Sequence, residues 1–128
     1  MSYYINKTVT EGFDQTVQRV TDLLKREGFG VLTEIDVDKV FKQKLDVDFT
    51  RYKILGACNP DFAYKAIQGE NKVGTMLPCN VIVRESSDTE IEVAAVDPIA
   101  SMLAIDNPSL REIAVDVREK LSRVIRDT

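Results

Sequence analysis

The stretch DFTRYKILGACNPDFAYKAI, residues 48–67, contains two hydrophobic patterns in immediate succession. Its first part, residues 48–58, is rich in the aromatic and β-branched side chains that strands favour. Asn59 is then a favourable helix cap, and Pro60 at the first helical position gives up no hydrogen bond. The stretch therefore predicts a strand that passes directly into a helix, whose buried side chains would be Phe62, Ala63, Ala66 and Ile67.

Residues 79–84 and 89–96 are two further apolar stretches, joined by four polar residues. Two strands this close in sequence are best interpreted as an antiparallel hairpin. The combination of a cap and a proline occurs again at Asp97-Pro98 and at Asn107-Pro108. The first predicts a short turn of helix, and the second predicts a long amphipathic helix with apolar positions at Leu110, Ile113, Ala114, Val117, Leu121, Val124 and Ile125.

The N-terminal part predicts two more strands and two more helices. Residues 3–9 and 29–35 have the composition of strands. Gly28 is the natural end of the helix between them, whose apolar positions are Phe13, Val17, Val20 and Leu24. Asp36 or Asp38 would cap a second, shorter helix with apolar positions at Val37, Val40, Phe41 and Leu45.

Together these elements predict a single α+β domain over residues 1–128. Five strands would form a mostly antiparallel sheet, and the helices would cover one of its faces in a two-layer arrangement. The other face would be exposed unless a second subunit covers it.

The composition is that of a folded domain, with 44% hydrophobic and 30% charged residues among 128. A formal net charge of −4 argues against a nucleic-acid partner or an anionic membrane surface. We expect a cytoplasmic protein, because we find no signal-peptide pattern, no apolar run of about 18 residues and only two cysteines. Histidine is absent, which excludes Ser-His-Asp and Cys-His catalysis and histidine metal ligands within one chain.

Cys58 and Cys79 are the first candidates for a functional site. Each is followed by an asparagine, Asn59 or Asn80, and each has a proline within two positions. Cys58 would lie just outside a helix N-terminus, where the thiolate form is favoured. Two thiols could bind a thiophilic metal such as zinc, form a reversible disulfide, or simply fill buried space.

Other polar residues have both a functional and a structural interpretation. Arg51 and Lys53 could form an anion-binding pair, or they could belong to a solvated strand face. Asp97 is most simply the cap of the turn that begins at Pro98. The remaining polar candidates are Asp48 and Arg84, and we expect Met76, Met102 and Leu103 in the core or at an interface. The glycines match no phosphate-binding motif.

The segments ILGACNP, residues 54–60, and VGTMLPCNV, residues 73–81, resemble the domain of unknown function 302 family, as do Val96-Asp97-Pro98 and Met102. The resemblance covers nearly the whole chain. It implies a strand-helix-four-strand-helix arrangement similar to the TATA-binding-protein-like class, and a homodimer. The family has no settled activity. Its paired Cys-Asn-Pro and Pro-Cys-Asn segments match this chain without departure and favour one shared site around the two cysteines.

Three functional hypotheses follow. The preferred one is a non-enzymatic homodimeric binding protein, whose ligand or metal site would contain Cys58, Asn59, Cys79, Asn80 and Asp97. The second is a thiol-redox enzyme or sensor in which Cys58 attacks and Cys79 resolves. The third is a structural domain in which both cysteines pack and the exposed sheet face is an interface.

Overall fold

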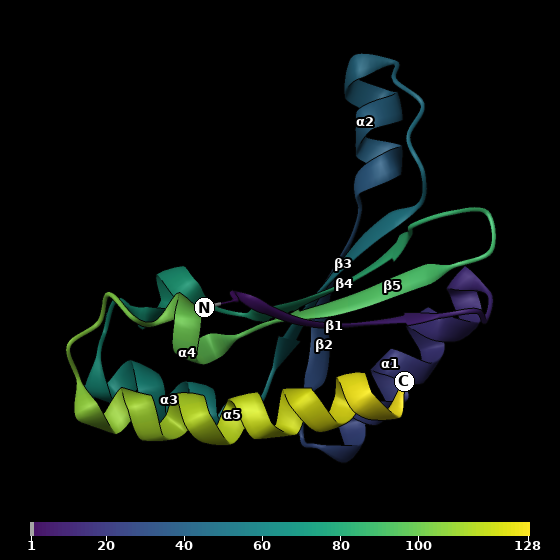
Figure 1. The fold of residues 1–128 in the computed structure, drawn as a ribbon. Helices are drawn as coiled ribbons and strands as arrows, with labels where there is room; N and C mark the ends of the chain where they lie inside the picture. The colour runs from purple at the N-terminus through teal and green to yellow at the C-terminus, as the bar shows by residue number, and fades with distance from the viewer. Residues whose placement is uncertain (1) are drawn as a thin grey trace.

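The computed structural model describes residues 2–128, which form one five-stranded antiparallel sheet with helices on one face (Figure 1). The strand order is β1-β5-β4-β3-β2, and every neighbouring pair is antiparallel. The strands are β1 (Tyr4–Val9), β2 (Gly30–Asp36), β3 (Tyr52–Cys58), β4 (Cys79–Glu85) and β5 (Ile91–Val96). The expected α+β class is confirmed.

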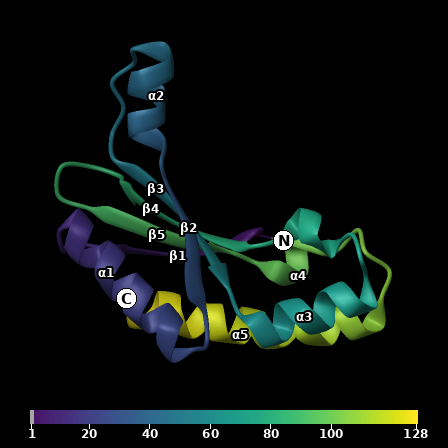
Figure 2. The ribbon, with the colours of Figure 1, turned by 180° about the vertical axis from the view of Figure 1, so that it is seen from behind.

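Two long helices, α1 (Phe13–Arg26) and α5 (Pro108–Asp127), cover one face of the sheet. The shorter α3 (Pro60–Gly69) lies beside α5 in both views (Figures 1 and 2). A 3-10 turn, η1 (Val73–Met76), and α4 (Pro98–Ser101) complete this end of the molecule. On the opposite face of the sheet no helix of the described residues is packed, as Figure 2 also shows.

The three cap-and-proline pairs begin helices as the sequence predicts. The Asn59 side-chain oxygen accepts from the Phe62 amide at 3.5 Å at the start of α3. Asp97 caps α4, and Asn107 caps α5 by accepting from the Ser109 amide at 3.1 Å. Gly28 follows α1 with a φ of +86°, the left-handed conformation that favours glycine.

The core lies between the sheet and the two long helices. Its fully buried side chains come from both layers and include Leu24 of α1, Leu55 of β3, Val81 of β4, Val93 of β5 and Leu121 of α5. A smaller cluster lies under α3 and η1 and consists of Ala66, Val73, Met102, Leu110 and Ala114. This second cluster borders the site described below.

The helix α2 (Val37–Leu45) and the segment that returns from it form an arm that projects from the sheet (Figure 1). No residue of α2 is buried. The arm also corrects the expected strand over residues 48–58, because β3 begins only at Tyr52. Residues 46–51 instead run back along α2. Lys42 forms ion pairs with both Asp46 and Asp48, and the ring centroids of Phe41 and Phe49 are 5.3 Å apart.

Two further expectations about burial need correction. Ala66 on α3 is buried, because it packs in a cluster with residues of η1 and α5, but the next residue, Ile67, is exposed. Met102 is buried as expected, whereas Leu103 and Met76 are exposed, which leaves only the interface alternative for these two residues. Within residues 2–128, no helix has the length and apolar character that crossing a membrane requires.

Candidate functional site

A narrow cleft lies where β3 ends and β4 begins, against α3, α4 and α5. Three sulfur-containing side chains line it, those of Cys58, Cys79 and Met102. The rest of the wall is almost entirely apolar, with Phe29, Phe62, Ala66, Pro98, Ala114 and Val117 among its residues. We call this feature the sulfur-lined cleft.

Strand register and the end of β3 explain why both cysteines reach one cleft. Ala57 on β3 is the direct antiparallel partner of Cys79 on β4. Alternation along a regular strand would turn the next residue, Cys58, to the other face. Cys58 is however the last residue of β3, where the chain leaves the sheet for α3, and it lines the cleft. The structure thus brings both cysteines to one cleft, a proximity that the sequence leaves open.

Met102 was not among the residues predicted for the site. It follows α4, which the Asp97 cap and Pro98 place beside the cleft. Its thioether sulfur is a soft donor, like the two thiols. The signal for it in the sequence was weak, because a buried methionine ordinarily fills irregular space in a core.

The size of the sulfur-lined cleft limits what it can hold. Its free volume is about 30 Å³, enough for a body the size of a water molecule. Pockets for organic ligands are usually about ten times larger or more. The cleft therefore fits a single ion or atom-sized ligand far better than a metabolite.

Burial controls the protonation of Cys79. It raises the pKa of this thiol to about 11, and the neighbouring Cys58 adds to the effect. Burial acts in this direction because the thiolate loses hydration. Cys79 therefore carries its proton at neutral pH and gives it up only to a ligand that binds the sulfur strongly.

Asn59 and Asp97 lie next to this region, but their polar atoms have other partners. Besides capping α3, Asn59 donates to the Glu27 carbonyl at 3.5 Å and so ties α3 to the end of α1. Asp97 is buried; one carboxylate oxygen accepts from the Ile99 amide at 2.9 Å, and the other accepts from Arg118 at 2.9 Å. Asn59 lines the cleft, whereas Asp97 does not.

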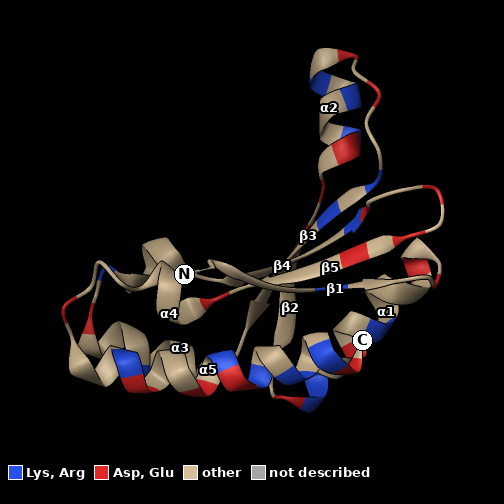
Figure 3. Ribbon diagram, in the orientation of Figure 1, with Lys and Arg blue, Asp and Glu red and all other residues tan. Residues whose placement is uncertain are grey.

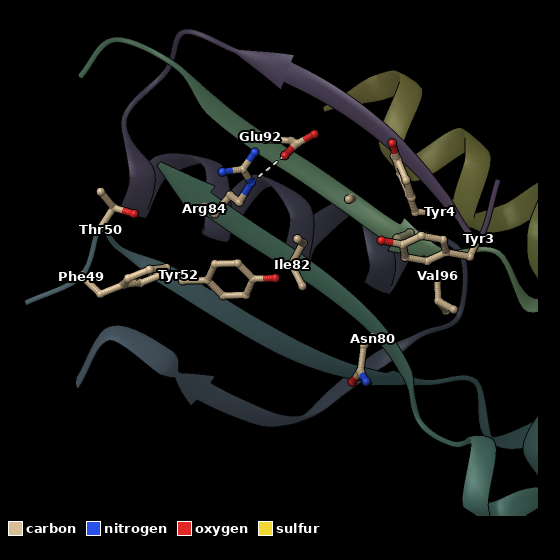
Figure 4. A pocket seen from close by; sticks show the side chains of 12 residues that line it. Tyr3, Tyr4, Phe49, Thr50, Tyr52, Asn80, Ile82, Arg84, Glu92 and Val96 are labelled. Carbon is tan, nitrogen blue, oxygen red and sulfur yellow. Dashed lines mark hydrogen bonds and ion pairs between the residues drawn. The ribbon is translucent and has the colours of Figure 1, made fainter. Parts of the chain in front are cut away.

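Asn80 lies on the other face of the sheet from Cys79. Neighbouring residues of a strand point to opposite faces, and Asn80 lines a separate hollow on the uncovered face (Figure 4). The predicted five-residue site is therefore divided: Cys58, Asn59 and Cys79 share the cleft, Asp97 caps the adjoining helix, and Asn80 is elsewhere.

The proposed anion pair is occupied by carboxylates of the chain itself. Arg51 donates to Asp14 at 2.9 Å and lies over the ring of Phe13, and Lys53 pairs with Asp36 at 3.5 Å. Charged residues mark the outer sides of α1 and α5 and the arm, as Figure 3 shows. In residues 2–128, histidine, cysteine and carboxylate side chains form no group of three that could hold a metal.

Comparisons of the chain with family models and with solved structures both find matches. The family model described as "Domain of unknown function DUF302" matches residues 5–128. A crystal structure described as an uncharacterized conserved DUF302 protein from Bacillus stearothermophilus is similar, with 29% sequence identity and a TM-score of 0.90. The match covers 98% of each chain. A comparison with curated proteins gives no match.

Proposed function

Because the chain belongs to the DUF302 family, whose description names no activity, we propose from its own geometry that it binds a soft metal ion, Cu(I), in the sulfur-lined cleft. The observation that carries this proposal is the convergence of Cys58, Cys79 and Met102 on one small apolar cleft. Thiolate and thioether sulfur are the ligands that Cu(I) prefers among protein side chains.

The donor set favours Cu(I) over zinc. A structural zinc site requires four ligands, drawn from cysteine, histidine and carboxylates. The part of the chain that the structure describes offers two thiols in the cleft and no third group of that kind near them. A soft monovalent ion is satisfied by two thiolates with a thioether beside them. The small volume of the cleft argues in the same direction.

An anaerobic titration with Cu(I) tests this proposal, with bicinchoninate as the competing chelator. We expect one equivalent of Cu(I) per chain. The apparent affinity should rise with pH, because Cu(I) must displace the proton of Cys79, whose pKa is about 11. Release of that one proton makes the apparent affinity rise about tenfold per pH unit between pH 6 and 9.

Two results of this titration would contradict the proposal. One is the absence of Cu(I) uptake against the chelator. The other is an affinity that does not change between pH 6 and 9, since a ligand set without the Cys79 sulfur would release no proton from it.

A thiol-redox role is the second candidate, favoured by the presence of both thiols in the same cleft with Cys58 the more accessible. Cys58 would attack glutathione disulfide and release one glutathione thiolate, and Cys79 would displace the second, leaving a Cys58–Cys79 disulfide. The two thiols lose two protons and two electrons, which the glutathione disulfide accepts. Two free thiols after equilibration with that oxidant would exclude this role.

We further propose that the functional protein is a homodimer formed through the arm. Large apolar side chains are exposed on β2, on α2 and on the segment that follows it, namely Leu32, Ile35, Val40, Leu45, Val47 and Phe49. Monomeric proteins rarely leave more than a few hundred Å² of apolar surface exposed in one region. A second copy of the arm would cover such side chains with a surface of the same kind.

Light scattering on the Leu45→Lys variant checks the dimer. Leu45 is 66% exposed, so a lysine there should not disturb the fold of one chain. We expect wild type to have the mass of two chains and Leu45→Lys to shift toward one. Leu103→Lys is the matched control, because Leu103 is 61% exposed but lies after α4, away from the arm. A wild-type monomer at tens of micromolar would remove the basis of this proposal.

A further inference from the structure

The uncovered face of the sheet carries a hollow of about 590 Å³, lined by residues of β1, β3, β4 and β5, by Tyr3 before β1, and by Phe49 and Thr50 at the base of the arm. This volume lies within the range of about 300–1,000 Å³ that small-molecule sites occupy. The strand register explains its shape. Ala94 on β5 is the direct partner of Ile82 on β4, and the small alanine leaves a depression between larger neighbours. We call this feature the aromatic hollow.

Aromatic side chains stand on two sides of the aromatic hollow (Figure 4). Tyr52 lies on one side, and Tyr3 and Tyr4 lie on the other with their rings 5.0 Å apart in an edge-to-face contact. Tyr3 is 73% exposed. Flat aromatic surfaces of this kind gain free energy by stacking against a planar apolar partner.

One arginine gives the aromatic hollow a free cationic edge. Arg84 donates through Nε to Glu92 at 2.7 Å. Its terminal Nη groups make no hydrogen bond within residues 2–128. They are the part of the guanidinium that can grip a carboxylate through two parallel hydrogen bonds.

The neighbouring acid does not cancel this property. One oxygen of Glu92 accepts from Arg84, and the other accepts from the Asn6 amide at 2.8 Å. The hydrogen bond from Asn6 lowers the pKa of Glu92, as does Arg84, so the carboxylate stays charged and engaged. Glu92 thus orients the Arg84 side chain, while the Nη edge stays available.

We propose that the aromatic hollow binds a small planar aromatic carboxylate. The ligand's carboxylate would meet the Nη edge of Arg84, and its ring would lie over Ile82 and Ala94 between the tyrosines. Asn80, Ile82 and Arg84 alternate along one face of β4. The backbone distance from Asn80 to Arg84 is roughly 13 Å, so a ligand that meets Arg84 would extend along β4 toward Asn80. Asn80 then offers an amide to a polar group at the far end.

Calorimetry with naphthalene-2-carboxylate tests this inference in the full-length protein. The neutral naphthalene-2-carboxamide keeps the rings and removes the charge, and cyclohexanecarboxylate keeps the charge and removes the planar ring. We expect the planar carboxylate to bind most tightly of the three. Arg84→Gln should weaken its binding about tenfold or more, because the charged hydrogen bonds are lost. Tyr52→Leu should weaken binding through loss of the stacking surface.

Arg126→Gln is the matched control, since Arg126 pairs with Asp127 at the end of α5. It should bind naphthalene-2-carboxylate as wild type does. Equal binding of the carboxylate and the carboxamide would overturn the role of Arg84. No binding of any of the three probes would overturn the site. If none of the probes binds and light scattering shows that Tyr52→Leu dissociates a wild-type dimer, a second copy of the chain occupies this face instead of a ligand.

Discussion

Replacing either Cys58 or Cys79 by serine is expected to weaken Cu(I) binding by more than about 100-fold. Loss of a residue that only supports a metal ligand costs up to about 100-fold in affinity, and loss of a ligand itself should cost more. Serine preserves the size of each side chain but replaces a soft sulfur by a hard oxygen that Cu(I) disfavours. Both variants should fail, because two thiolates act on one ion. The measurement is competition against bicinchoninate at fixed pH, alongside thermal unfolding of each metal-free variant.

Methionine variants separate coordination from mere burial. Met102→Leu keeps the volume of a cleft residue and removes its sulfur, so we expect weaker Cu(I) binding with little loss of stability. Met76→Leu is the matched control, because Met76 is exposed on η1 and does not line the cleft. Wild-type affinity in both cysteine variants would rule out the sulfur-lined cleft as the Cu(I) site.

The second large effect concerns Gly56, which lies in β3 between β2 and β4. A Cβ at this position would overlap Oγ1 of Thr33 on β2 and lie 2.9 Å from Cγ of Pro78. Crowding of this kind costs about 1–3 kcal/mol. We expect Gly56→Ala to lower the free energy of unfolding by that amount, a large share of the total for a domain of this size.

Urea denaturation of a small set of variants checks the reason for this loss. Gly30→Ala is the control: Gly30 is also a strand glycine, but a Cβ there meets nothing within 4 Å. It should leave stability near wild type. Adding Thr33→Ala to Gly56→Ala should recover part of the loss, because it removes Oγ1 and leaves the Pro78 contact. An unaltered denaturation midpoint for Gly56→Ala would contradict the packing described for β3.

Local signals in the sequence were sufficient to place most of the secondary structure. Asn59-Pro60, Asp97-Pro98 and Asn107-Pro108 each begin a helix, since a cap oxygen and a proline satisfy the first turn using neighbouring residues only. The hairpin of β4 and β5 is equally local. These predictions depend on contacts within a few positions and are confirmed.

The arm is the part of the fold that local sequence signals predict least well. The spacing of Val37, Val40, Phe41 and Leu45 predicts a helix with an apolar side, and α2 is that helix. The spacing carries no information on what covers that side, and none of these residues is buried. The predicted strand also began too early for this reason. Phe49 contacts Phe41 of α2 instead of extending the sheet, so β3 begins at Tyr52.

The candidate site was predicted in part for a related reason. Cys58 and Cys79 line one cleft only because β3 and β4 pair in one particular register, which depends on residues far apart in the chain. Asn80 could have been separated from Cys79 from the sequence alone, since successive strand residues face opposite ways. Met102 reaches the cleft from a third element, and no spacing in the sequence connects it with the cysteines.

X-ray absorption at the copper edge of the Cu(I)-loaded protein tests the central claim most directly, because it identifies the atoms bound to the metal. We predict sulfur neighbours only, two from Cys58 and Cys79 with Met102 as a weaker third, and loss of this signature in Cys79→Ser. A first shell of nitrogen and oxygen, or an unchanged sulfur shell in Cys79→Ser, would contradict the assignment of the sulfur-lined cleft as a soft-metal site.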